Sequence, residues 1–152
     1  MAKKGLKDLM VLVLSVSLVI GVVLAGGCVQ YEIKAPEPET PTQIIENITP
    51  QEAFTLIQNN KNNPDFVIID VRTPEEFAHE HIENTINIDY SSEIFRGELN
   101  KLDKNKTYLI HCQSGNRSGK ALDIMAKLNF REVYNMLGGI NQWKAAGLPT
   151  TK

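Results

Sequence analysis

The chain has 152 residues with a net charge of −2, and 22% of its residues are charged, which is an ordinary composition for one globular domain. No basic run occurs beyond the first few residues, so we expect no nucleic-acid partner. The two cysteines, Cys28 and Cys112, lie in dissimilar surroundings and do not indicate a disulfide framework.

The first 27 residues have the pattern of a signal or anchor segment. Lys3, Lys4 and Lys7 precede an apolar run over 9–24, and small residues follow up to Cys28. Small residues before a cysteine resemble a lipobox, the signal for cleavage and lipid attachment at that cysteine. The alternative is an uncleaved helix, because the run approaches the roughly 20 residues that span a bilayer. Both alternatives predict a membrane-anchored domain on the extracytoplasmic side, with the lysines inside.

Prolines and glutamates are interleaved between Cys28 and Gln43. This composition predicts an extended, charged spacer over 28–43 that holds the domain away from the membrane. We therefore place the folded domain at 44–152.

Within that domain, short apolar runs alternate with helical patterns. Strands are predicted at 44–48, 66–69, 86–88, 108–111 and 132–136. Helices are predicted from Pro50 to about Asn60, from Pro74 for a short stretch, at 92–99, at 118–128, and from Gly138-Gly139 through Trp143. Because the strands are apolar on both sides, the pattern predicts an α/β fold whose parallel sheet carries helices on both faces.

Cys112 ends the strand at 108–111, and a small polar loop, Arg117 and a helix follow it. Backbone N–H groups of a tight loop form an anion-binding nest, and a helix N-terminus adds positive potential. Together with Arg117 they favour thiolate over thiol, so the pKa of Cys112 should fall. The same groups would hold an anionic substrate against the sulfur. A buried, inert cysteine is the structural alternative.

Four residues separate Cys112 from Arg117, one fewer than in the phosphate-binding loop of cysteine phosphatases. The shorter loop makes a tighter cradle, which suits a persulfide better than a tetrahedral phosphate. We therefore expect sulfur chemistry and little phosphatase activity.

Several motifs together resemble a single-domain rhodanese, a thiosulfate-type sulfurtransferase, over about 44–149. They are Asp70-Val71-Arg72, Glu76-Phe77, His81-Ile82, Cys112 to Ser118, Gly138-Gly139-Ile140, Trp143 and Gly147-Leu148-Pro149. The resemblance implies a central five-stranded parallel sheet and a Cys112 persulfide, without a cofactor. Sulfur would pass from a small anionic donor to a thiol or other nucleophilic acceptor. A carrier or redox sensor that does not turn over is the alternative.

The resemblance also assigns roles around Cys112. The expected donor-binding residues are Gln113, Ser114, Gly115, Asn116, Arg117 and Ser118. Asp70 and Arg72 end a strand at the same edge of the sheet, and we expect them to brace the loop by ion pairing.

The three histidines have other expected roles. The spacing of His79 and His81 is poor for a metal site, so no metal is expected. We expect His81 to hydrogen-bond backbone in its turn. His111 precedes Cys112 on a strand, so its side chain should point to the opposite face and not act as the base for Cys112.

The chain departs from the family pattern at three turns, where Glu80, Asn84 and Asn129 replace the usual glycine. Asparagine tolerates left-handed backbone, so Asn84 and Asn129 should be mild changes. Glutamate does not, so we expect the turn before His81 to differ.

Overall fold

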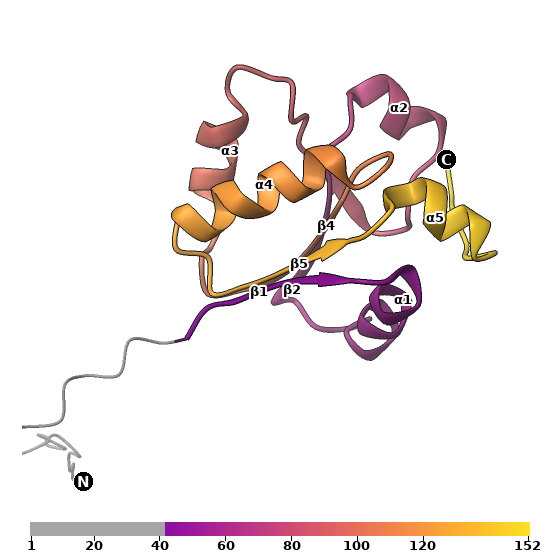
Figure 1. Cartoon of the computed structure of the whole chain (residues 1–152), viewed down its shortest axis with the longest axis horizontal. Coiled ribbons are helices and arrows are strands. Elements are labelled where there is room, and N and C mark those ends of the chain that lie inside the picture. The colour runs from indigo at the N-terminus through magenta and orange to yellow at the C-terminus, as the bar shows by residue number, and fades with distance from the viewer. Residues whose placement is uncertain (1–41) are drawn as a thin grey trace, which may run out of the picture. The chain divides into compact units, whose positions relative to one another are not determined.

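The computed structural model describes residues 42–152, which form one five-stranded parallel sheet and five helices (Figure 1). The strands are β1 (Ile44–Ile48), β2 (Phe66–Asp70), β3 (Thr85–Asn87), β4 (Thr107–His111) and β5 (Glu132–Met136). The helices are α1 (Pro50–Asn59), α2 (Pro74–His79), α3 (Phe95–Lys101), α4 (Asn116–Lys127) and α5 (Gly139–Ala145). The strand order is β1-β5-β4-β2-β3, with β4 at the centre. The predicted fold class is confirmed.

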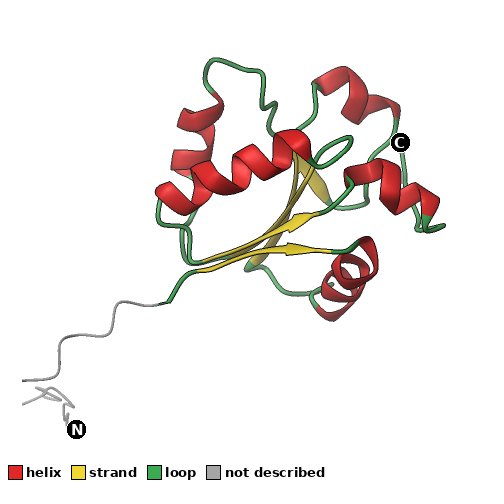
Figure 2. Cartoon of the chain, viewed as in Figure 1, coloured by secondary structure: helices red, strands yellow, loops and turns green. Residues whose placement is uncertain are grey.

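Each face of the sheet carries its own apolar core, because successive strand residues point to opposite sides. Ile69 and Ile110 pack in the core beneath α3 and α4. Ile68 and Leu109, their neighbours on the same strands, pack in the core that includes Trp143 of α5 and the α1 helix. Figure 2 shows the helices on both sides of the strands. At the carboxyl end of this layered sheet, the central strand β4 leads directly to Cys112.

Helices α1 and α2 begin with the same Thr-Pro-x-Glu pattern, and both form a capping box with proline in the first turn. In α1, the Thr49 N–H donates to the Glu52 carboxylate at 2.8 Å, and the Glu52 N–H donates to the Thr49 hydroxyl at 3.3 Å. In α2, Thr73 and Glu76 make the same two bonds at 2.9 and 3.3 Å.

Two helices begin at residues that differ from the sequence prediction. Helix α3 begins at Phe95, not at residue 92, because Asp89 first forms a turn in which its side chain accepts from the Ser91 N–H. Helix α4 begins at Asn116, two residues early, because Gly115 turns the chain directly into the helix with a φ of 91°.

Two of the three residues that replace the usual glycine adopt left-handed backbone, and the third does not. Asn84 and Asn129 both adopt left-handed backbone, each with a φ of 61°. Glu80 is extended, with a φ of −168° and a ψ of 136°, so its turn needs no left-handed residue. His81 follows in a bridge to Thr151, and its ring lies 3.0 Å from the Phe77 carbonyl oxygen.

Cys28, the segment 1–27 and all but the last two residues of the spacer 28–43 lie outside the described residues. Over 42–152, no helix combines the length and apolar character that a membrane crossing requires.

Candidate active site

Cys112 follows β4 directly and lies at the carboxyl edge of the sheet, where sites form in open parallel sheets. The residue is 1% exposed and packs in the core beneath α3 and α4. Its sulfur accepts a hydrogen bond from the Gly115 N–H at 3.1 Å and one from the Ser118 hydroxyl at 3.5 Å. The loop from 113 to 118 therefore closes around the sulfur.

These donors alter the acidity of the thiol. Burial, the largest single influence, raises the pKa of Cys112. Hydrogen bonds from the Ser118 hydroxyl and from the Ser118, Ser114 and Gly115 N–H groups outweigh burial and hold that pKa below its ordinary value. A lowered pKa places more of the sulfur in the nucleophilic thiolate form at neutral pH.

The outer side of the loop is held by the start of α5. The Cys112 carbonyl oxygen accepts from the Ile140 N–H at 2.8 Å, and the Gln113 carbonyl oxygen accepts from the Asn141 N–H at 3.1 Å. Gly139 has a φ of 58°, and a Cβ there would lie 2.3 Å from the Cys112 oxygen. The carbonyls are thus held toward α5 while loop N–H groups point at the sulfur.

Sequence reasoning placed Gly138-Gly139 at the start of the last helix and among the family motifs, but it assigned the pair no contact with the Cys112 loop. Two successive glycines at the start of a helix indicate positive φ angles or a close approach of the backbone to another group. What that backbone approaches became apparent only from the fold, because the two segments are distant in sequence.

Asp70 and Arg72 form a buried pair at the end of β2, with exposures of 0% and 4%. The Arg72 Nε and Nη2 donate to Asp70 Oδ2 at 2.8 and 2.7 Å, and Nη2 also donates to the Glu80 carbonyl oxygen at 2.6 Å. The Arg72 Nη1 reaches Gln113 Oε1 at 3.3 Å. The pair therefore joins β2, the end of α2 and the Cys112 loop.

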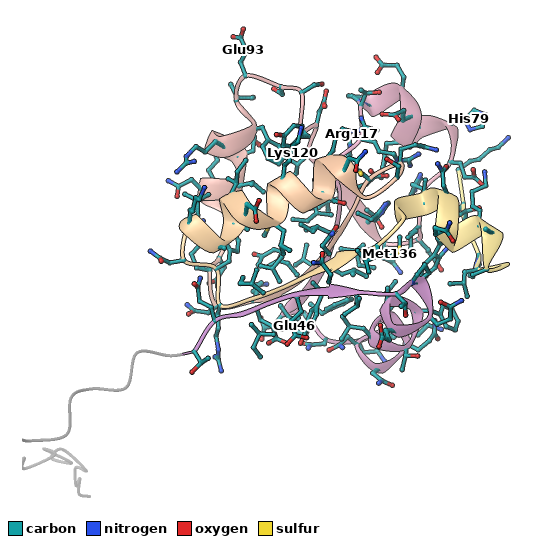
Figure 3. The ribbon with its side chains drawn as sticks, viewed as in Figure 1. Glu46, His79, Glu93, Arg117, Lys120 and Met136 are labelled. Atoms are coloured by element: carbon teal, nitrogen blue, oxygen red, sulfur yellow. The ribbon has the colours of Figure 1, made fainter. Side chains whose placement is uncertain are left out.

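Arg117 lies at the start of α4, on the side of that helix nearest α2 (Figure 3). Its Nη1 and Nη2 donate to the two carboxylate oxygens of Glu76 at 2.7 and 2.8 Å, which is a bidentate pair. The hydrogen bond from Arg117 lowers the pKa of Glu76 to about 2. The pKa of Arg117 is raised, mainly by Glu76 and further by the nearby Cys112 sulfur. Sequence reasoning had identified no carboxylate partner for Arg117.

The side chains of Ser114, Asn116 and His111 make no hydrogen bond to the Cys112 sulfur. Ser114 and Asn116 are exposed on the loop. His111 is fully buried without a hydrogen-bond partner for either ring nitrogen, and its Nε2 lies 3.9 Å from an Asp70 oxygen. Burial lowers the pKa of His111, so the ring is neutral. Over residues 42–152, no three His, Cys, Asp or Glu side chains are grouped to hold a metal ion.

A cavity of about 270 Å³ borders the loop. Its lining residues come from the β2 end, α2, the loop and α5: Arg72, Glu76, His79, Glu80, Gln113, Ile140 and Lys144. Across it, Lys144 of α5 pairs with Glu80. A larger cavity of about 490 Å³ includes Phe54 and Trp143, but no residue of the Cys112 loop lines it. The smaller cavity is therefore the one that borders the Cys112 loop, which it meets at Gln113.

Comparison with known proteins places this arrangement in a family. The model of the rhodanese-like domain matches residues 53–146. The chain is 36% identical over 113 residues to an uncharacterised protein of Synechocystis, a match spanning 73% of this chain and 59% of that protein. It is 31% identical over 102 residues to thiosulfate sulfurtransferase GlpE of Coxiella burnetii, spanning 67% of this chain and 90% of GlpE.

Among solved structures, a rhodanese-related protein from Thermoplasma volcanium is similar with a TM-score of 0.59 and 28% identity. That similarity covers 70% of this chain and 97% of the Thermoplasma chain. The prediction of a rhodanese-type sulfurtransferase is confirmed at the level of the family, since the chain belongs to the rhodanese-like domain family.

Proposed function

We propose that this protein moves sulfane sulfur from a small, thiosulfate-like anion to a nucleophilic acceptor through a persulfide on Cys112. The observation that carries the proposal is the enclosure of the Cys112 sulfur by hydrogen-bond donors of its own loop. The same donors that stabilise a thiolate can stabilise a persulfide anion one atom longer.

In the donor half-reaction, the Cys112 thiolate attacks the outer sulfur of the donor. A new S–S bond forms at Cys112, the bond between the two donor sulfurs breaks, and the electron pair leaves with sulfite. Arg117 and the loop N–H groups hold the anionic end of the donor, and they stabilise the charge on the departing group.

In the acceptor half-reaction, a cyanide ion or a thiolate attacks the outer sulfur of the persulfide. The acceptor takes that sulfur, and the bonding electron pair returns to Cys112 as thiolate. Because each half passes through a modified enzyme, ping-pong kinetics are expected. The Asp70–Arg72 pair braces the loop through Gln113 during both steps.

Replacing Cys112 with serine tests the proposal, with transfer from thiosulfate to cyanide as the assay. Activity should vanish, and intact-protein mass spectrometry after thiosulfate should show a gain of one sulfur only in the wild type. Near-normal activity in Cys112→Ser would overturn the assignment. A single round of transfer without turnover would instead favour the carrier or sensor alternative.

Phosphatase chemistry is the rival use of a cysteine loop that ends in arginine. Hydrolysis of an aryl phosphate by the wild type should be negligible, because the loop has four residues between Cys112 and Arg117. Robust hydrolysis would contradict the choice of sulfur transfer.

We propose further that the N-terminal segment tethers the domain to the outer side of a membrane, with Cys28 as the lipidated residue. The support is the sequence pattern of residues 1–28. In the native host, wild type should lose residues 1–27 and gain lipid mass, and Cys28→Ala should do neither. If wild type keeps the segment and Cys28→Ala fractionates identically, the anchor is an uncleaved helix.

A further inference from the structure

Glu76 uses one carboxylate for two tasks. Its Oε2 accepts from the Thr73 N–H at 2.9 Å, which caps α2, and also from Arg117 Nη1 at 2.7 Å. Its Oε1 accepts from Arg117 Nη2 at 2.8 Å. Glu52, at the equivalent position of α1, makes only the capping contacts to Thr49. Capping alone therefore does not explain the orientation of Glu76.

We propose that Glu76 is a positioning residue, which fixes the Arg117 guanidinium beside the Cys112 sulfur and thereby controls use of the anionic donor. The inference rests on the proposed function for its second part. Its first part, the effect on Cys112, is independent of sulfur transfer.

The geometry of the guanidinium supports this role. Glu76 engages one N–H from each terminal nitrogen of Arg117, and the guanidinium carries five N–H groups in all. The remaining N–H groups stay available for the sulfur or a bound anion. An arginine side chain without a partner would lose rotamer entropy on being fixed in one place. The carboxylate offsets that cost before the donor arrives.

The position of α2 gives the carboxylate a firm base. Thr73 and Pro74 start the helix, and Arg72, directly before them, is held by Asp70 and reaches Gln113 of the loop. The short segment from the end of β2 to Glu76 is therefore held by hydrogen bonds at both of its ends. Glu76 also lines the cavity of about 270 Å³ that borders the loop at Gln113.

Whether donor use falls or rises when Glu76 is removed distinguishes a residue that positions Arg117 from one that blocks it. If Glu76 merely occupied the place of the donor on Arg117, its removal would improve donor use. If it positions Arg117, its removal leaves the guanidinium mobile, the Cys112 thiolate less stabilised and the donor poorly held.

The test is Glu76→Gln in the full chain, a variant that keeps shape and loses charge. We expect the pH midpoint of Cys112 alkylation by iodoacetamide, followed on the Cys112 peptide, to move upward. We expect kcat/KM for thiosulfate to fall by about 10- to 100-fold. In an Arg117→Ala background the same substitution should change kcat/KM less than about twofold, since Glu76 acts through Arg117.

Two matched controls isolate the capping role. Thr73→Ala removes the capping hydroxyl of α2 but leaves the Glu76 carboxylate, and Glu52→Gln alters the same box on α1. Both should leave the alkylation midpoint and thiosulfate kinetics unchanged.

Three outcomes would overturn the proposal. They are a higher kcat/KM in Glu76→Gln, an equal loss with and without Arg117, and a Thr73→Ala variant that reproduces the Glu76→Gln changes. If wild type transfers no sulfur at all, the proposed function fails, but the alkylation midpoint still decides whether Glu76 positions Arg117.

Discussion

The two Thr-Pro-x-Glu helix starts are locally alike and differ in what surrounds them. Both lie at the carboxyl edge of the parallel sheet, Thr49 directly after β1 and Thr73 shortly after β2, but only the second start is linked to the Cys112 loop, through Arg117. The pKa of Glu52 is lowered by hydrogen bonds from Thr49 alone, whereas that of Glu76 falls to about 2 mainly because of Arg117. The same four-residue pattern therefore forms only a helix cap in α1, whereas in α2 it forms a cap and also pairs with Arg117 beside the Cys112 loop.

The two helices are also anchored differently. Helix α1 buries Ala53 fully in the core it shares with α5, whereas α2 buries no residue. Polar contacts hold α2, including Glu76 to Arg117 and, just past its end, Glu80 to Lys144. Helix α2 is therefore held mainly by polar contacts, whereas α1 is held by apolar packing.

Arg117→Ala should give the largest effect, because it removes the partner that distinguishes α2 from α1. The kcat/KM for thiosulfate should fall about 100-fold, the cost of removing one donor that stabilises developing charge. Stability should change little, since Arg117 is a partly exposed loop-proximal side chain. Steady-state kinetics paired with urea unfolding measure both. Unchanged kinetics would make the Glu76 pair a purely structural contact.

Gly139→Ala should give the next largest effect, because the start of α5 approaches the loop as closely as α2 does. The φ of 58° and the backbone oxygen 2.3 Å from the added Cβ predict a loss of about 2 kcal/mol or more in unfolding free energy. Transfer activity should fall with it. Gly97→Ala in α3, where no atom lies within 4 Å, is the matched control and should be neutral or stabilising. Equal behaviour of the two variants would contradict the close approach.

The sequence alone was enough to predict the fold class and the position of Cys112, because both depend on local patterns. Apolar runs marked the strands, and a polar loop between strand and helix marked Cys112 as the candidate nucleophile. The Arg117 to Glu76 pair was not predictable, because it joins residues 41 apart in the sequence that only the fold brings together. The contact of Gly139 with the Cys112 oxygen escaped prediction for the same reason, and only its unusual residue type hinted at it.

Thr49→Ala and Thr73→Ala should have smaller and nearly equal effects on stability. Each removes a hydroxyl that accepts from the third-residue N–H at 3.3 Å, which is worth about 1 kcal/mol. Thermal unfolding should show similar shifts for the two variants, while thiosulfate kinetics stay at the wild-type level. A clear loss of transfer in Thr73→Ala only would mean that the cap of α2 contributes directly to the site.

The smallest expected effect is on stability at acid pH, where the substitutions Glu76→Gln and Glu52→Gln should have different consequences. Glu76 has a pKa of about 2 in the folded chain, below its ordinary value near 4.5, so its ionised form favours folding. That contribution is complete above pH 4.5 and is lost as pH falls toward 2. Urea unfolding of wild type and Glu76→Gln from pH 7 to pH 2.5 should therefore show a stability difference that shrinks below pH 4.5.

The same series with Glu52→Gln should shrink less, because Glu52 is held only by exposed contacts to Thr49. Parallel curves for wild type and Glu76→Gln across that range would show that Arg117 does not hold the ionised carboxylate in solution. In that case Glu76 would act as an ordinary cap like Glu52, and the two helix starts would behave alike in solution.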